Sequence, residues 1–348
     1  MQANPRTPSR HASAWTGAQL RPRSDWLERL DDADIADLDR ARRAVIAKGL
    51  TWGRFDKADF PLSVMPRRLA TIARELEDGR GFVLLRGLPV ERYTLEDIKI
   101  IYWGIGCHLG RIVPQNVKGV TLEHIEDLQV ANLNDPNLRG YVTTKGLDAH
   151  CDNSDTAVLL CVDRALRGGM SAIASLPALY NRILAERPDL LELLFQGYRY
   201  DLRGEGVTGS LDETSEPVPV FSSHAGRVRG WFHRRLILGG ADKAGITLSA
   251  AQREALDLVA DLAHHPDLML EHELQPGDLQ FLNNYTTIHW RTPYEDGEGH
   301  KRLLLRMWIN GLSRQARDPV FEKSWIVAGY QAREWARNRP IAALGNRV

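Results

Sequence analysis

The feature that most constrains the fold of this chain is a series of short apolar segments between residues 128 and 310, separated by turn-forming residues. Many short strands with intervening turns are typical of a jelly roll or barrel rather than of a parallel α/β sheet. The segments are LQVANL (128–133), TAVLLCV (156–162), MSAIAS (170–175), PVPVFSS (217–223), RVRGWFHRRL (227–236), LMLEHEL (268–274), LQFLNNY (279–285), TTIHWRT (286–292) and RLLLRMWIN (302–310).

Helical patterns flank and interrupt this series, with apolar residues recurring at helical spacing. We expect helices at 31–48, 65–77, 94–109, 177–185 and 249–264, a buried strand at 81–88, and a further helix around 320–337. No internal repeat or linker divides the chain. The sequence therefore predicts a β-rich α+β fold with one domain at 26–348, comprising a jelly-roll core at about 80–312 and a helical C-terminal appendage at 313–348. A flexible basic N-terminal arm is expected at 1–25.

Composition excludes several classes of partner. Lys+Arg and Asp+Glu both number 45, so no overall charge attracts nucleic acid or an anionic membrane. No apolar run is long enough to span a bilayer. The three cysteines form no CxxC pair, which indicates neither a disulfide framework nor a structural zinc site and fits a cytoplasmic protein. A small-molecule ligand is the expected partner, and homo-oligomerisation is left open.

The motif HxD occurs twice, at His150–Asp152 and at His265–Asp267. The second copy follows the predicted helix 249–264, where a histidine and a proline are ordinary stop signals. The first copy precedes the apolar segment 156–162. Residues i and i+2 of an extended segment point to the same side, so His150 and Asp152 could share a metal ion. A polar turn is the alternative.

A third ligand is available in TTIHWRT, where His289 lies among apolar and β-branched neighbours, although a hydrogen-bonded core histidine has the same pattern. Arg302 and Arg306 lie in an otherwise apolar segment, and buried guanidiniums require anions. Internal salt bridges or a bound carboxylate would both supply them. Two histidines and a carboxylate form the facial triad of non-haem iron oxygenases. The arginines add a site for a metal-chelating cosubstrate that carries a second carboxylate, which describes 2-oxoglutarate.

These motifs together resemble the TauD/TfdA family of Fe(II)- and 2-oxoglutarate-dependent dioxygenases over about residues 80–312. The order is HxD, GG-x-[ST], a distal histidine and RxxxR. The matching residues are His150 and Asp152, Gly168-Gly169-Met170-Ser171, His289, and Arg302 with Arg306.

The resemblance implies a double-stranded β-helix (cupin-like jelly roll) and specific roles for these residues. His150, Asp152 and His289 would bind Fe(II), and Arg302 would bind the distal carboxylate of 2-oxoglutarate with help from Ser171. Arg306 would bind an anionic group of the substrate, or share the role of Arg302. Cys151 and Ser171 stand where the family often has threonine.

The implied function is oxidation, most simply hydroxylation, of an unactivated C–H bond in a small anionic substrate, with O2 consumed and succinate and CO2 released. An intact Asp152 argues against halogenation. The alternatives are a cupin-like metal-dependent hydrolase or isomerase that does not use 2-oxoglutarate, and a non-catalytic small-molecule-binding protein. For each candidate substrate-binding residue, a local hydrogen-bonding role is the alternative. These candidates are Gln115, Asn116, Asn132, Leu147, Arg203, Trp231, Asn283 and Arg306.

Overall fold

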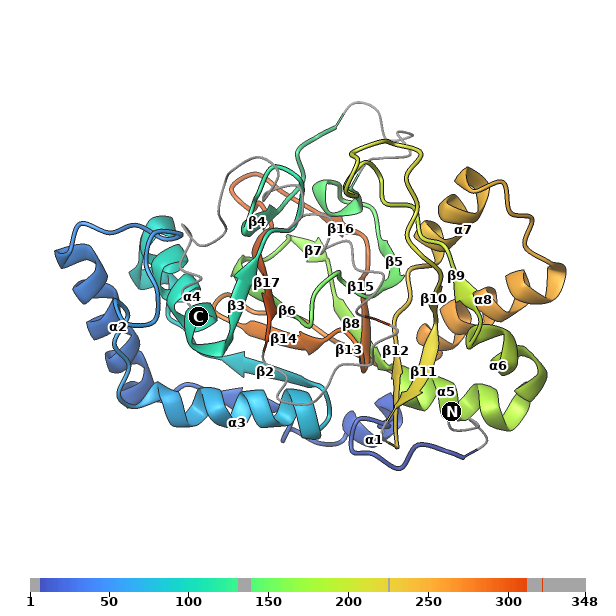
Figure 1. Ribbon diagram of the computed structural model, residues 1–348. Coiled ribbons are helices and arrows are strands. Elements are labelled where there is room, and N and C mark those ends of the chain that lie inside the picture. Colours follow the sequence, from blue (N-terminus) through green and yellow to red (C-terminus); the bar gives the residue numbers. More distant parts are fainter. Residues whose placement is uncertain (1–6, 131–138, 225, 312–320, 322–348) are drawn as a thin grey trace.

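Two β-sheets form the centre of the computed structural model, which describes residues 7–130, 139–224, 226–311 and 321 (Figure 1). The large sheet has seven strands in the order β1-β2-β14-β6-β17-β3, with β4 also paired to β17. Its strands are β1 (Leu27–Arg29), β2 (Phe82–Arg86), β3 (Arg111–Val113), β4 (Leu122–Ile125), β6 (Thr156–Asp163), β14 (Leu279–Asn283) and β17 (Leu303–Asn310).

The small sheet has four antiparallel strands in the order β13-β8-β15-β5. These are β5 (Leu147–His150), β8 (Ser171–Ser175), β13 (Met269–His272) and β15 (Thr287–Arg291). Three ribbons complete the described strands: β7 (Arg167–Gly168) with β16 (Tyr294–Glu295), β9 (Gly197–Tyr198) with β10 (Val218–Pro219), and β11 (Phe221–His224) with β12 (Arg227–Gly230).

Side chains from the two sheets meet between them. The Ser171 hydroxyl of β8 donates to the Gln280 side chain of β14 at 2.8 Å. On β17, alternate residues point in opposite directions, as the period of two requires. Leu305 and Met307 pack against helices, whereas Trp308 belongs to the core of the small sheet. The strands therefore place selected polar side chains in the space between two sheets, which is the predicted jelly-roll arrangement.

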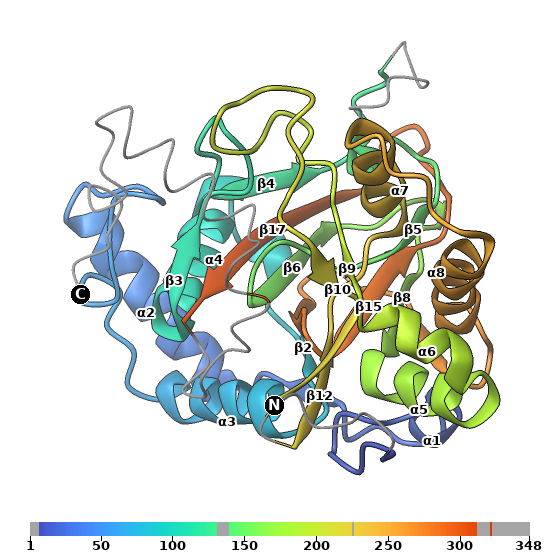
Figure 2. The same cartoon turned by 45° about the vertical axis from the view of Figure 1, so that its right-hand side comes forward.

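Helices cover the outer faces of both sheets (Figure 1, Figure 2). The first group packs against the large sheet and shares a hydrophobic cluster with it. It comprises α2 (Asp32–Ala47), α3 (Met65–Asp78) and α4 (Leu95–Leu109). The second group packs with the small sheet. It comprises α5 (Leu176–Glu186), α6 (Pro188–Leu194), α7 (Arg234–Lys243) and α8 (Ala250–Ala263). The remaining described helices are α1 (Gly17–Leu20) and the 3-10 turns η1 (Val90–Arg92) and η2 (Gly140–Val142). None of the described helices combines the length and the apolar character needed to cross a membrane.

Most predicted elements are present within one or two residues of their expected bounds, and two of the expected strands need correction. No strand forms at 128–130, and 131–133 lie outside the described residues. The segment 227–236 is a strand only to Gly230, because helix α7 begins at Arg234. Helices α6 and α7 and strands β1, β3, β4 and β5 were not expected from the local patterns. The predicted appendage at 313–348 lies outside the described residues except for Phe321, which is buried, so it stays a prediction, as do the other domain bounds.

The predicted flexible arm at 1–25 is not observed in its described part. Trp15 is 4% exposed and packs against Phe82, while the Ser9 backbone N–H donates to the Asn181 side chain at 2.7 Å. Helix α1 lies beside β13, where the Gly17 N–H donates to the Leu268 carbonyl. The tryptophan supplies the apolar contact that a purely basic arm would lack.

Asp37 of α2 anchors the start of α3. Its buried carboxylate accepts hydrogen bonds from the backbone N–H groups of Ser63, Val64 and Met65, at 2.7 to 3.1 Å. Burial opposes ionisation, but these bonds outweigh it and lower the pKa of Asp37 from 3.8 to about 2. A depressed carboxyl pKa stabilises the folded state above pH 4, and this contribution is lost as the pH falls from about 4 to about 2.

We expect Asp37→Asn to reduce the free energy of unfolding at pH 7 by about 2 kcal/mol, the equivalent of the lowered pKa. Urea unfolding at pH 7 and pH 3 measures the effect, and the difference from wild type should be smaller at pH 3. Asp32→Asn is the control, because Asp32 is exposed at the start of the same helix and should contribute less than about 0.5 kcal/mol. A difference that does not depend on pH would contradict this account.

Candidate metal centre and its two cavities

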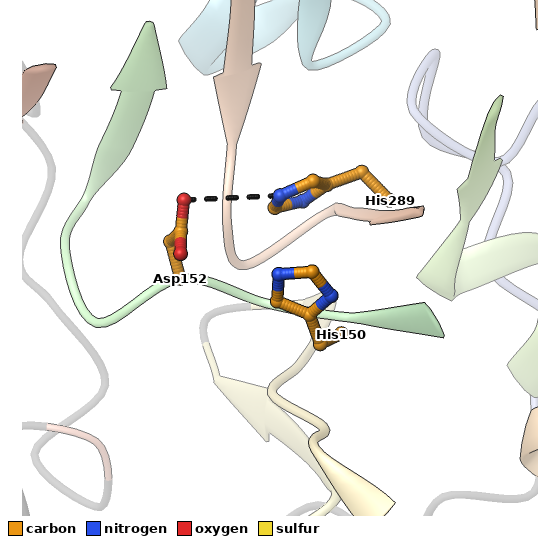
Figure 3. A group of neighbouring side chains, drawn as sticks. All are labelled: His150, Asp152 and His289. Atoms are coloured by element: carbon orange, nitrogen blue, oxygen red, sulfur yellow. Dashed lines mark ion pairs between the residues drawn. The ribbon is translucent and has the colours of Figure 1, made fainter. Parts of the chain in front are cut away.

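His150, Asp152 and His289 come together at the edge of the small sheet (Figure 3). His289 lies in the middle of β15 and is paired in register with His150, the last residue of β5. Asp152 follows two residues later. One possible ligand atom from each residue lies within 4.8 Å of the others, and His289 Nε2 is 3.7 Å from Asp152 Oδ2. The first HxD motif and the distal histidine therefore form one cluster.

The chemistry of these three groups suits a divalent metal ion. His150 Nδ1 donates to the Asp148 carbonyl at 2.7 Å, which leaves Nε2 as the ligand nitrogen. Burial lowers the pKa of His150, and it lowers the pKa of His289 to about 3, so both imidazoles are neutral. Asp152 Oδ2 is buried and has no hydrogen-bond partner among the described residues. A metal ion would satisfy this oxygen.

Arg306 of β17 holds the other oxygen of Asp152. Its Nη1 donates to Asp152 Oδ1 at 3.2 Å, and its Nε donates to the Gln115 side-chain oxygen at 2.7 Å. Gln115 in turn donates to the Arg306 carbonyl at 2.9 Å. Burial opposes the ionisation of Asp152, but the charge of Arg306 outweighs it, so the pKa of Asp152 is lowered. Gln115, a predicted substrate-binding residue, thus forms two hydrogen bonds with Arg306.

A first cavity, here the Arg302 cavity, extends from the histidines between the two sheets. Arg302 is 5% exposed, and its Nη1 has no hydrogen-bond partner among the described residues. Ser171 reaches the same cavity. Its lining residues are Ile125, Tyr141, Leu147, His150, Leu159, Ser171, Leu274, His289, Trp290, Arg291, Arg302, Leu304 and Arg306.

A second cavity, here the Arg203 cavity, meets the first at four shared residues: Tyr141, Leu147, His150 and Arg306. Its other lining residues are Arg139, Gly140, Gly146, Asp148, Cys151, Asp152, Asn153, Arg203, His233, Arg235, Leu236 and Trp308. Four arginines and two aspartates line it. Of the predicted substrate-binding residues, Leu147, Arg203 and Arg306 line this cavity.

The other predicted site residues have different positions. Asn116 donates to Glu123 at 3.2 Å, and Asn283 donates to the Leu76 carbonyl at 2.9 Å; neither lines the Arg302 cavity or the Arg203 cavity. The Trp231 indole N–H donates to the backbone carbonyl of Asp152 at 3.3 Å and so contacts the HxD segment through its main chain. Asn132 lies outside the described residues. These hydrogen bonds of Asn116 and Asn283 support the alternative of a local hydrogen-bonding role.

The second HxD motif lies on the surface after α8. Asp267 is 63% exposed, and its backbone N–H donates to His265 Nδ1 at 3.2 Å. Among the described residues, the group of three possible metal ligands that lie close together is the one that contains His150. The second motif therefore has no third ligand among them. This motif therefore ends a helix, as predicted.

Cys151, between two candidate ligands, is a core residue. Its side chain is 2% exposed, and its thiol lies 3.9 Å from the Thr287 carbonyl. Burial raises the pKa of the thiol to about 12, so it is protonated at neutral pH. Its place in the hydrophobic cluster of the small sheet explains a small, weakly polar side chain better than a role in metal binding does.

Sequence reasoning missed several lining residues, notably Arg291, His233, Arg139 and Arg235. Arg291 was detectable, because it lies two residues after His289 and a period of two places both on one face. His233 Nδ1 is buried without a described partner, and burial lowers the pKa of His233 well below its usual value. His233 forms an isolated bridge with His150, a tertiary contact that no local pattern indicates.

Comparisons with known proteins agree with this geometry. The chain is 33% identical over 303 residues to FR-33289 synthase of Streptomyces rubellomurinus, covering 86% of this chain and 89% of that protein. It is 30% identical over 306 residues to the taurine hydroxylase-like protein SAT17 of Stachybotrys chartarum, covering 84% and 77%.

Solved structures share the fold at lower identity. An asparagine oxygenase in complex with Fe(II), 2S,3S-3-hydroxyasparagine and succinate matches with a TM-score of 0.63 and 16% identity, covering 82% of this chain and 93% of that one. The non-haem iron oxygenase OrfP in complex with Fe and α-ketoglutaric acid matches with a TM-score of 0.61 and 16% identity, covering the same shares. The predicted jelly-roll fold is confirmed.

The family model described as "Taurine catabolism dioxygenase TauD, TfdA family" matches residues 47–308, most of the chain. The match begins upstream of the region that the motifs indicated and ends close to the same point. It confirms the predicted enzyme class and its cofactors. The chain belongs to the TauD/TfdA family of non-haem iron, 2-oxoglutarate-dependent dioxygenases.

Proposed function

We propose that this protein hydroxylates an unactivated C–H bond of a small anionic substrate, with O2 and 2-oxoglutarate consumed and succinate and CO2 released. The observation that supports the proposal is that two cavities meet at the three candidate metal ligands. His150 and Arg306 line both the Arg302 cavity and the Arg203 cavity. A cosubstrate in one cavity and a substrate in the other would both reach the metal.

The residues fit these roles by charge and position. His150, Asp152 and His289 would hold Fe(II), and Arg302 with Ser171 would bind the distal carboxylate of 2-oxoglutarate. When bound, the iron and 2-oxoglutarate supply the oxidising chemistry. The protein contributes the positions of the bound groups and the fixed orientation of Asp152 by Arg306.

An anionic substrate is supported by the arginines of the Arg203 cavity. Arg139 pairs with Glu205 and Arg306 pairs with Asp152, so part of the positive charge is already compensated. Arg203 and Arg235 line the same cavity. A relative is named as taurine hydroxylase-like, and taurine carries a sulfonate. A carboxylate, sulfonate or phosphonate group would suit the same charges.

Binding of the cosubstrate tests the first part of the proposal. Anaerobic addition of 2-oxoglutarate to the Fe(II)-loaded protein is expected to produce a weak visible charge-transfer band. A folded, iron-loaded protein that lacks this band would contradict the proposal and favour a hydrolase, an isomerase or a binding protein.

Matched substrate pairs test the preference for a negative charge. We expect succinate release to be stimulated by small acids and not by the corresponding amides or alcohols, measured at equal concentration with O2 and 2-oxoglutarate present. The acid of a productive pair should have a kcat/KM about 10-fold or more above its neutral analogue, as expected for one charge-assisted contact. Equal stimulation by both members of each pair would contradict an anionic substrate.

A further inference from the structure

Arg291 shares its strand and its side of the small sheet with the candidate ligand His289. The two residues are separated by one position on β15, so their side chains leave the same face. In the antiparallel register with β8, Arg291 lies directly opposite Ser171, the residue with the predicted cosubstrate role. Both line the Arg302 cavity. The strand therefore places a second guanidinium beside Arg302.

The guanidinium of Arg291 is buried and only partly satisfied. Arg291 is 5% exposed, and its Nη2 donates to the backbone carbonyls of Thr143, at 2.9 Å, and Lys145. Its Nε and Nη1 are buried and have no hydrogen-bond partner among the described residues. Leaving such donors unpaired costs free energy, and a buried charge without an anion costs more.

The positive charges of Arg291 and Arg302 lie close together, which raises the free-energy cost of burying either one without an anion. Both guanidiniums lie against the ring of Tyr294. The Cζ atom of Arg291 is 4.6 Å from the ring centre, and that of Arg302 is 5.1 Å from it. Burial lowers the pKa of Arg291 to about 10, and the charge of Arg302 contributes to the shift. Arg306, by contrast, has Asp152. Among the described residues the cavity thus holds two buried guanidiniums that lack a carboxylate partner.

We propose that Arg291 is a second binding residue for the distal carboxylate of 2-oxoglutarate, acting together with Arg302. The inference rests on the proposed function. A carboxylate has about four lone-pair sites, so it can accept hydrogen bonds from Arg302 and from the free Nε and Nη1 of Arg291 at once. The ligand also supplies the negative charge that the cavity lacks. Arg291 thereby contributes to the choice of a dicarboxylic over a monocarboxylic 2-oxo acid.

A purely structural role makes a different prediction. If Arg291 only held residues 143–145 through its Nη2, its loss would disturb every ligand of the cavity to the same extent. Two ligands separate these roles: 2-oxoglutarate, and 2-oxopentanoate, in which a methyl group replaces the distal carboxylate. Their dissociation constants for the anaerobic Fe(II)-loaded protein are measured by calorimetry. The quantity of interest is the ratio of the dissociation constant of 2-oxopentanoate to that of 2-oxoglutarate.

We expect Arg291→Gln to weaken 2-oxoglutarate binding by about 10- to 100-fold, the effect of a charge-assisted contact, and to change 2-oxopentanoate binding by less than about 2-fold. Arg291→Met, which keeps the apolar stem over Tyr294, should give the same fall in the ratio. Arg291→Lys should restore part of it. The control is Arg167→Gln, because Arg167 is exposed on β7 outside the cavity and the ratio should remain that of wild type.

A ratio that stays at the wild-type value in the folded Arg291→Gln or Arg291→Met protein would overturn this inference alone. An equal loss of both ligands would assign Arg291 the structural role and overturn it as well. Wild-type protein that binds neither ligand would overturn the proposed function too, so the two failures are distinguishable.

Discussion

Replacement of Asp152 by alanine is expected to abolish succinate formation, with a loss of more than about 100-fold, the upper range for residues that merely support a metal ligand. Asp152 offers the one carboxylate of the cluster with His150 and His289. Its removal also leaves Arg306 buried without its partner, which costs about 3–5 kcal/mol of folding stability. Iron content, succinate release and thermal unfolding should therefore all change.

Two further variants separate loss of the metal from loss of the fold. Asp152→Asn keeps the shape of the side chain and an oxygen for Arg306, so it should fold better than the alanine variant and still fail to retain iron. Asp267→Ala is the matched control, because Asp267 is the aspartate of the other HxD motif and is 63% exposed. It should form succinate at the wild-type rate. Inactivity of Asp267→Ala together with an active Asp152→Ala would mean that the metal site is at the other motif.

The sequence was sufficient to predict the residues of the cluster, because their signals are local or ordered along the chain. His150 and Asp152 precede a buried strand, and His289 lies in a β-branched segment that pairs with β5 in register. Local signals also predicted β2, β6, β14 and β17 of the large sheet and β8, β13 and β15 of the small sheet, whereas β1, β3, β4 and β5 were not predicted. The same reasoning rejected His265–Asp267 from its position after a helix, and the structure agrees.

The partners of the arginines could not be predicted from the sequence, because they depend on contacts between distant segments. Gln115 and Arg306 are 191 positions apart, and their hydrogen bond gives Gln115 an arginine partner that its local sequence does not indicate. Trp231, which directly follows β12, likewise donates to the Asp152 carbonyl. His233 is brought beside His150 by an isolated bridge, and α7 follows directly where the pattern suggested a continuing strand. Period and composition carry no information on such tertiary pairs.

The RxxxR motif left open which arginine binds 2-oxoglutarate, and the structure gives Arg302 and Arg306 different surroundings. Arg306 donates to Asp152 and Gln115 beside the metal cluster. Arg302 has a buried Nη1 without a described partner and lies against Tyr294. A residue that orients a metal ligand and a residue that binds the cosubstrate should fail in different ways when replaced.

Arg302→Gln is therefore expected to weaken 2-oxoglutarate binding by about 100-fold, because more than one charge-assisted hydrogen bond is lost. Its iron affinity should stay within about 2-fold of wild type. Arg306→Gln should instead lower iron affinity by about 10- to 100-fold, the effect of losing a residue that orients a ligand. It should leave the preference for 2-oxoglutarate over 2-oxopentanoate unchanged. Anaerobic iron titration and calorimetry of both variants measure the two quantities separately.

Gln115→Leu provides an internal check on this division of roles. It removes the acceptor of Arg306 Nε at 2.7 Å without touching the Arg302 cavity, so it should reproduce a weaker form of the Arg306→Gln defect. Loss of cosubstrate preference in Arg306→Gln with normal iron affinity would reverse the assignment of the two arginines. Because Arg302 lies directly before β17, Arg306 lies in it and both are buried, a defect shared equally by both variants would indicate a general loss of packing, which thermal unfolding would detect.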